Sequence, residues 1–128
     1  MELAPTRLRT LPSWLINQTA IPAQRLVAAG LAERGATRQQ YALLAALDER
    51  GPASQAALGR TGGIDPSDRR RNVVTITATG RRRLRQLDAT VAELQDDLLA
   101  PLTAGERRQL TDLLTKLVEH HRQERLSG

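Results

Sequence analysis

The chain has 128 residues, the length of one ordinary domain, and its 19 basic and 14 acidic residues give a net charge of +5. It has no cysteine, which excludes disulfides, thiolate metal sites and cysteine nucleophiles. No apolar run reaches membrane-spanning length and no signal peptide is evident, so we expect a cytoplasmic protein with no membrane partner. Leucine and alanine dominate the apolar content, which predicts a mostly helical protein with an aliphatic core. The basic balance favours a nucleic-acid partner.

The N-terminal third contains helix signals interrupted by prolines. Residues 1–12 are polar and hold two prolines, so we expect an arm or extension there. Ser13 is expected to cap a helix that begins at Trp14. Pro22 should kink this helix or start a new one, and Gly35 should end the segment.

A second helical segment follows at once. The sequence Thr-Arg-Gln-Gln at residues 37–40 fits a capping box, and Gly51-Pro52 should stop the helix that it opens. Ser54 is expected to cap a short helix that reaches Gly59. Two helices joined in this way fit the entry to a helix-turn-helix.

The stretch from Asp65 to Gly80 carries the most specific signal. It opens with the turn sequence Asp-Pro-Ser-Asp, continues with three arginines at 69–71, and ends in the β-branched run Val73–Thr77. Within that run Val74 and Ile76 should face a core. A cationic loop tip on a short strand suits insertion into the narrow, electronegative minor groove of DNA.

This order of turn, charge, strand and helix resembles the wing of a MarR-type winged helix-turn-helix regulator, and the matching residues are Asp65, Pro66, Asp68, Arg69, Arg70, 73–77 and Gly80. The resemblance implies a mainly α fold with a small β wing, built as a single domain over 1–128. The winged-helix DNA-binding part would lie in 37–80, and dimerisation helices would lie in 1–34 and 84–128. A solvated arginine turn in another α+β domain is the alternative.

The chain departs from this family at the recognition helix. A turn, an average helix and a short strand need roughly 20 residues or more, yet Ile64 runs directly into the wing signature. Asp65 could also be the N-cap of a recognition helix with Pro66 as its first residue, followed directly by the end of the wing. In both interpretations the base-reading helix is missing or cut to a stub. Either residues are absent from this sequence, which we favour, or the protein lacks this helix; an intact mass near 14.1 kDa would exclude the first explanation.

A long helix should start at Thr79 or Gly80 and end before Pro101. Apolar residues recur along it at spacings of three and four, at Leu84, Leu87, Val91, Leu94 and Leu98. Four arginines in its first turns oppose the helix macrodipole, which fits either a nearby phosphate or plain solvation; they are Arg81, Arg82, Arg83 and Arg85. A capping box at residues 103–106 should open a last helix, which reaches about Arg122 and carries an apolar stripe over 110–118.

The two leucine stripes either pack on their own chain or join two copies, and we favour a homodimer. The resemblance places the interface in the first helix and the last two helices, with Leu11, Leu15, Leu94, Leu98, Leu110, Leu114 and Leu117 as its residues. A two-fold dimer would present two wings to a pseudo-palindromic duplex site.

The resemblance implies a DNA-binding repressor that a small ligand releases from DNA. The predicted DNA-binding residues are Ser54, Gln55, Ser67, Asp68, Arg69, Arg70 and Arg71. Trp14 and Tyr41 could line a pocket for the inducer, although such residues are more often core. The alternative function is a helical dimer or interaction module without its own DNA-reading helix; an RNA-binding role is weaker because stacking aromatics are scarce.

No enzyme is predicted. His120 and His121 are adjacent on a helix and should point about 100° apart, so they cannot form the i, i+4 histidine pair of a metal site. The serines lack a nucleophile-elbow context, and the glycines at 59, 62 and 63 lack a P-loop lysine. The sequence therefore predicts no catalytic residue, no metal ligand and no cofactor.

Overall fold

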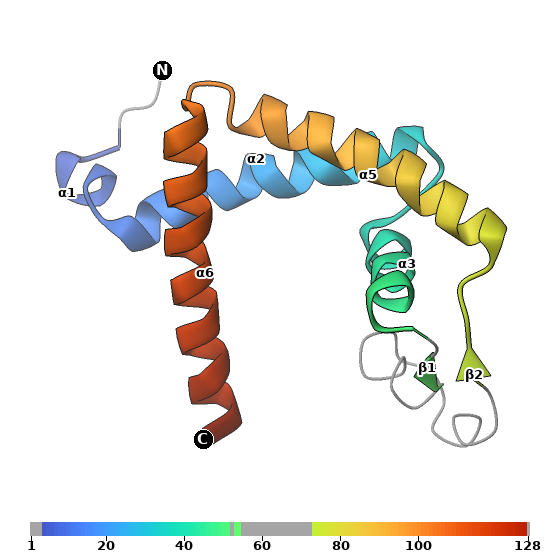
Figure 1. Cartoon of the computed structure of the whole chain (residues 1–128). Coiled ribbons are helices and arrows are strands. Elements are labelled where there is room, and N and C mark those ends of the chain that lie inside the picture. Colours follow the sequence, from blue (N-terminus) through green and yellow to red (C-terminus); the bar gives the residue numbers. More distant parts are fainter. Residues whose placement is uncertain (1–3, 52, 55–72, 128) are drawn as a thin grey trace. The chain divides into compact units, whose positions relative to one another are not determined.

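The computed structural model describes residues 4–51, 53–54 and 73–127, and within this part it is mainly helical, as predicted (Figure 1). The elements in chain order are α1 (Thr6–Arg9), α2 (Pro12–Glu33), α3 (Arg38–Arg50), β1 (Ala53–Ser54), β2 (Val73–Val74), α5 (Ala78–Leu98) and α6 (Ala104–Ser127). The chain divides into two compact units, Met1–Leu94 and Gln95–Gly128. None of the helices in the described residues is long and apolar enough to cross a membrane.

Helix α2 corrects two sequence predictions. It begins at Pro12, and its N-cap is Leu11 with no side-chain hydrogen bond, so Ser13 is not the cap. Proline fits the first helical position because its fixed φ is helical and its missing N–H would be unpaired there anyway. The helix also runs through Pro22 without ending, so the alternative of a new helix starting there is wrong.

The end of α2 follows a Schellman motif. Gly35 has a φ of +71°, and its N–H donates to the carbonyl of Ala32 at 2.9 Å. The N–H of Ala36 donates to the carbonyl of Leu31 at 2.9 Å, and both of these side chains are buried. The predicted capping box then opens α3, because the side chains of Thr37 and Gln40 each accept from the other's backbone N–H.

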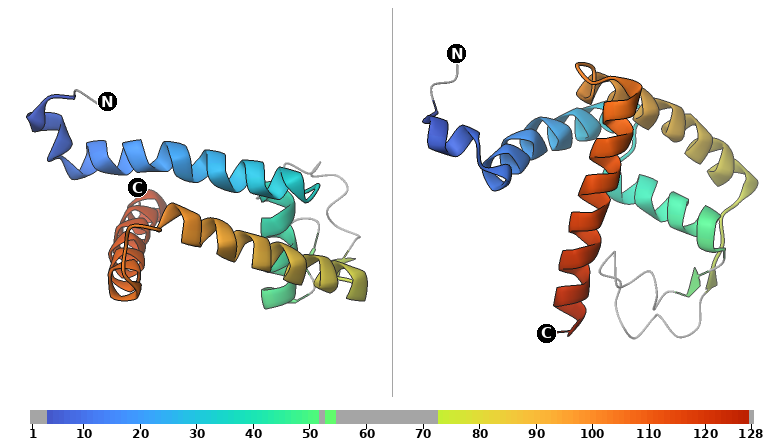
Figure 2. Two further views of the ribbon diagram at one scale, coloured as in Figure 1. Left: turned by 90° about the horizontal axis from the view of Figure 1, so that it is seen from above. Right: turned by 60° about the vertical axis from the view of Figure 1, so that its left-hand side comes forward.

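The core of the first unit lies where α2, α3 and α5 meet. Leu31 and Leu87 are 0% and 1% exposed, and Val27, Tyr41, Leu44 and Val91 pack against their cluster. Helices α2 and α5 lie alongside each other (Figure 2). They approach each other closely at Gly30, where a Cβ atom would lie 2.5 Å from Cδ1 of Leu94. The first residues of the predicted α5 stripe, Leu84, Leu87 and Val91, therefore pack inside the chain.

Strands β1 and β2 pair antiparallel, with Ala53 opposite Val74 and Ser54 opposite Val73. The strand predicted over 73–77 is only two residues long. It stops early because Thr77 already caps α5: its Oγ1 accepts from the N–H of Gly80 at 3.0 Å, and the helix begins at Ala78. The predicted alternation holds, since Val74 and Ile76 are half-buried whereas Thr75 and Thr77 are exposed.

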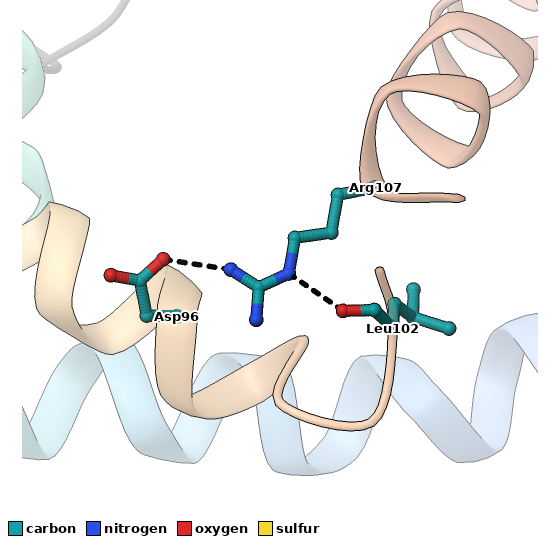
Figure 3. A network of polar contacts seen from close by, with 3 residues as sticks. All are labelled: Asp96, Leu102 and Arg107. Atoms are coloured by element: carbon teal, nitrogen blue, oxygen red, sulfur yellow. Dashed lines mark hydrogen bonds and ion pairs between the residues drawn. The ribbon is translucent and has the colours of Figure 1, made fainter. Parts of the chain in front are cut away.

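The second unit holds the turn from α5 into α6. The predicted capping box is present, with Thr103 N–H donating to Glu106 at 2.9 Å and Glu106 N–H donating to Thr103 at 3.2 Å. Arg107 donates to Asp96 at 2.9 Å and to the carbonyl of Leu102 at 3.3 Å (Figure 3). Asp96 is exposed but paired, so Arg107 links the end of α5 to the loop that precedes α6.

Candidate nucleic-acid interface

Of the residues predicted to contact DNA, only Ser54 lies within the described residues. It ends β1 and is paired with Val73 of β2. The others lie outside the described residues: Gln55, Ser67, Asp68, Arg69, Arg70 and Arg71. Because Ser54 and Val73 are register partners, the segment that carries the arginine triplet leaves the sheet and re-enters it at neighbouring positions.

The expectation that the base-reading helix is missing or cut to a stub concerns the junction from Ile64 to Arg69. The two explanations, residues absent from this sequence or a protein without this helix, both stay predictions, and an intact mass near 14.1 kDa would exclude the first. The junction itself lies outside the described residues.

The four arginines at the start of α5 divide into two kinds. Arg83 donates to the carbonyl of Arg34 at the C-terminal end of α2, and Arg81 lies 3.6 Å from a carboxylate oxygen of Asp48 on α3. A cation at a helix C-terminus also complements the macrodipole there. Arg82 and Arg85 are exposed, and Arg82 bonds within its own helix to Thr79 at 3.1 Å. Arg83 is thus structural, whereas Arg82 and Arg85 remain candidates for phosphate contacts.

Tyr41 ties α3 to α5 through a contact that the sequence did not indicate. Its hydroxyl donates to Oδ1 of Asp88 at 2.7 Å. This hydrogen bond, helped by burial and by the negative charge of Asp88 and Glu49, raises the pKa of Tyr41 to about 12. The partners are 47 residues apart in the sequence. No sequence motif marks Asp88, which follows Leu87 of the leucine stripe, so the sequence did not predict this pair.

A polar cleft of about 390 Å³ lies in the first unit beside the end of α2, and it is lined by Arg34, Arg83, Gln86, Leu87, Ala89, Thr90 and Glu93. Neither Trp14 nor Tyr41, the predicted ligand-binding pair, is in its lining. Trp14 precedes Val27 by 13 residues of one helix, and Val27 and Tyr41 both pack against the core cluster. At 1.5 Å per residue Trp14 lies about 20 Å along α2 from Val27, so it is remote from this part of the core.

Comparisons with protein-family models and with curated proteins found no match. Solved structures do match. A probable transcriptional regulator from Pseudomonas aeruginosa has 30% identity and a TM-score of 0.68, and the match covers 86% of this chain and 98% of that one. A MarR family protein from Mycobacterium tuberculosis in complex with DNA has 24% identity and a TM-score of 0.72, with 84% and 98% covered. The same protein in complex with salicylic acid has 25% identity and a TM-score of 0.60, with the same coverage.

The chain belongs to the MarR family. The resemblance seen in the sequence is therefore confirmed, and with it the prediction that the protein is a regulator of transcription and not an enzyme.

The predicted dimerisation residues of this MarR-family chain differ in exposure. Leu94, Leu98 and Leu110 are half-buried within the chain. Leu11, Leu15, Leu114 and Leu117 are exposed, as are the neighbouring Ile16, Leu113 and Val118. The exposed members lie at the start of α2 and along α6, so both segments present apolar surface within one chain.

Proposed function

We propose that the protein binds duplex DNA as a homodimer and acts as a repressor that a small ligand releases. The observation that carries the proposal is the pairing of Ser54 with Val73, which anchors both ends of the arginine-bearing segment in one small sheet. A net charge of +5 and a MarR-family relative solved with DNA add support. Repression and ligand release follow the family resemblance.

In this proposal Arg69, Arg70 and Arg71 enter the minor groove, where a narrow groove concentrates negative potential. The other predicted DNA-binding residues hold the protein backbone and the wing turn against the DNA phosphates; they are Ser54, Gln55, Ser67 and Asp68. Arg82 and Arg85 at the start of α5 add phosphate contacts, since they are exposed and lie in the helix that follows β2. Phosphate contacts of this kind supply affinity without sequence information.

The dimer would form through the start of α2 and the apolar stripe of α6. Leu113, Leu114, Leu117 and Val118 are all exposed in a helix that must bury its apolar side somewhere to be stable. A two-fold interface uses the same patch on both chains. It would set two wings about one helical turn of DNA apart, which matches a pseudo-palindromic site.

The polar cleft beside α2 is the candidate ligand site. Arg34 and Arg83 would attract a small anion such as the salicylic acid bound by the Mycobacterium tuberculosis relative, and Leu87 and Ala89 supply apolar wall. Arg83 also holds the end of α2, so an anion that engages its guanidinium would loosen α5 from α2. Trp14 remains a ligand-site candidate only where a second chain completes the pocket.

The test is Arg70→Ala, measured as duplex-DNA affinity over a range of salt concentrations. We expect weaker binding to all duplex sequences and a log–log salt slope flatter by about one unit, because one phosphate contact is lost. Arg122→Ala is the matched control, since it removes the same charge from the exposed surface of α6. Equal slopes for both variants would contradict the wing assignment, and no duplex binding by the unmodified protein at low salt would favour the interaction-module alternative.

A further inference from the structure

A cluster of potential metal ligands lies on α6, beyond the C-terminal end of its apolar stripe and on the helical face of Leu117. His120 Nε2 lies 3.2 Å from Glu124 Oε1, and His121 Nδ1 lies 3.3 Å from Glu124 Oε2. One ligand atom from each of the three residues falls within 4.8 Å of the other two. These are the only two histidines of the chain, and both meet one carboxylate.

The sequence argument against a metal site considered only a pair of histidines. Adjacent helical residues do diverge, and two imidazoles at i and i+1 alone would not share an ion. Glu124 changes this, because it is i+4 from His120 and i+3 from His121 and so lies on the same side of the helix as each. The two rings approach edge to face, with centroids 4.9 Å apart. The carboxylate of Glu124 thus contacts both imidazoles, although the two histidines leave the helix in different directions.

The separations fit a coordinated ion. Zinc binds imidazole nitrogen at about 2.0–2.1 Å and carboxylate oxygen at about 2.0–2.2 Å. Two ligand atoms at a tetrahedral angle about such an ion lie roughly 3.3–3.4 Å apart. The nitrogen–oxygen distances of 3.2 and 3.3 Å are close to this spacing, and they run to different oxygens of Glu124, so the carboxylate would bind the ion through both oxygens or turn to offer one.

We propose that His120, His121 and Glu124 bind one late first-row divalent metal ion of the zinc class. Two imidazoles and a carboxylate suit zinc, nickel and copper better than calcium or magnesium, which prefer all-oxygen sites. All three residues are exposed, so water completes the coordination. Charged residues near the cluster in the sequence of α6 are Lys116, Glu119, Arg122 and Arg125, and all three proposed ligands come from one chain.

The test is a zinc titration of the full chain followed by isothermal calorimetry. We expect one saturable ion per chain, because the three side chains offer one shared site. His120→Ala, His121→Ala and Glu124→Gln should each weaken affinity by about tenfold or more, since even outer-shell partners contribute about 10–100-fold.

Glu119→Gln is the matched control, because it removes an exposed carboxylate from the same helix but not from the cluster. Far-ultraviolet circular dichroism of each variant establishes that α6 stays folded, and the visible spectrum of the Co²⁺ form of the unmodified chain reports nitrogen coordination directly. Absence of saturable zinc binding would overturn the proposal. Equal zinc affinity in Glu119→Gln and in both histidine variants would overturn it too. Neither result bears on DNA binding.

Discussion

The first unit and helix α6 use the same residue type in opposite ways. In the first unit, leucines at spacings of three and four reach 0% and 1% exposure at Leu31 and Leu87. On α6 the same spacing leaves Leu113 and Val118 each 59% exposed. Periodicity therefore identifies an apolar face but does not tell what covers it. In the first unit the cover is the chain itself, and on α6 we propose that it is a second chain.

The largest effect that separates the two regions is expected from Leu87→Ala. Truncating a fully buried leucine removes transfer free energy and leaves a cavity, so the free energy of unfolding should fall by about 2–5 kcal/mol. Urea denaturation at a fixed protein concentration measures this loss. A loss below about 1 kcal/mol would contradict the placement of Leu87 at the centre of the core.

Leu117→Glu is the counterpart on α6. This residue is exposed within one chain, so a charge there should not unfold the first unit; instead it should prevent two chains from burying their α6 stripes together. Analytical ultracentrifugation should show a dimer in the unmodified protein and a 14.1 kDa monomer in the variant. Lys116→Glu is the matched control, because it faces away from the stripe and should leave the dimer intact.

The Tyr41–Asp88 hydrogen bond gives a smaller effect with a distinctive pH dependence. Tyr41→Phe should cost about 1–2 kcal/mol, since it leaves a carboxylate without its donor. The pKa of Tyr41 in the folded chain is raised from 10.0 to about 12, so the folded state keeps its proton where the unfolded state loses it. The contribution is complete below pH 10 and is lost as pH rises through 12.

Tyr41 is the only tyrosine, so the ultraviolet absorbance of tyrosinate reports its titration directly. Asp88→Asn should bring the midpoint back towards 10.0, whereas Asp97→Asn, an exposed change on the same helix, should leave it raised. If both variants titrate alike, the hydrogen bond is not the cause of the shift.

Local signals in the sequence predicted local structure well. Both capping boxes and the glycine stops at Gly35 and Gly51 are present because their partners lie within a few residues. A prediction failed where a neighbouring residue also favours a helix start: Ser13 was predicted to be the N-cap, but α2 begins at Pro12. The contact of Arg83 with Arg34 joins residues 49 apart, and no periodicity encodes such a pair. The wing arginines remain a prediction, because they lie outside the described residues.

The smallest expected effect compares one glycine from each region. A Cβ at Gly105, near the start of α6, would meet its nearest atoms at 3.9 and 4.0 Å, which is ordinary contact. Gly105→Ala should therefore stabilise by about 0.4–1 kcal/mol, because alanine loses less backbone entropy on folding. A Cβ at Gly30 would lie 2.5, 2.6 and 3.0 Å from three side-chain atoms of Leu94. Gly30→Ala makes the same change in helix propensity, but Leu94 must move, and overpacking typically costs about 1–3 kcal/mol. Opposite signs in urea denaturation would establish that Gly30 is closely packed and Gly105 is not, and a stabilised Gly30→Ala would show that Leu94 has room to turn aside.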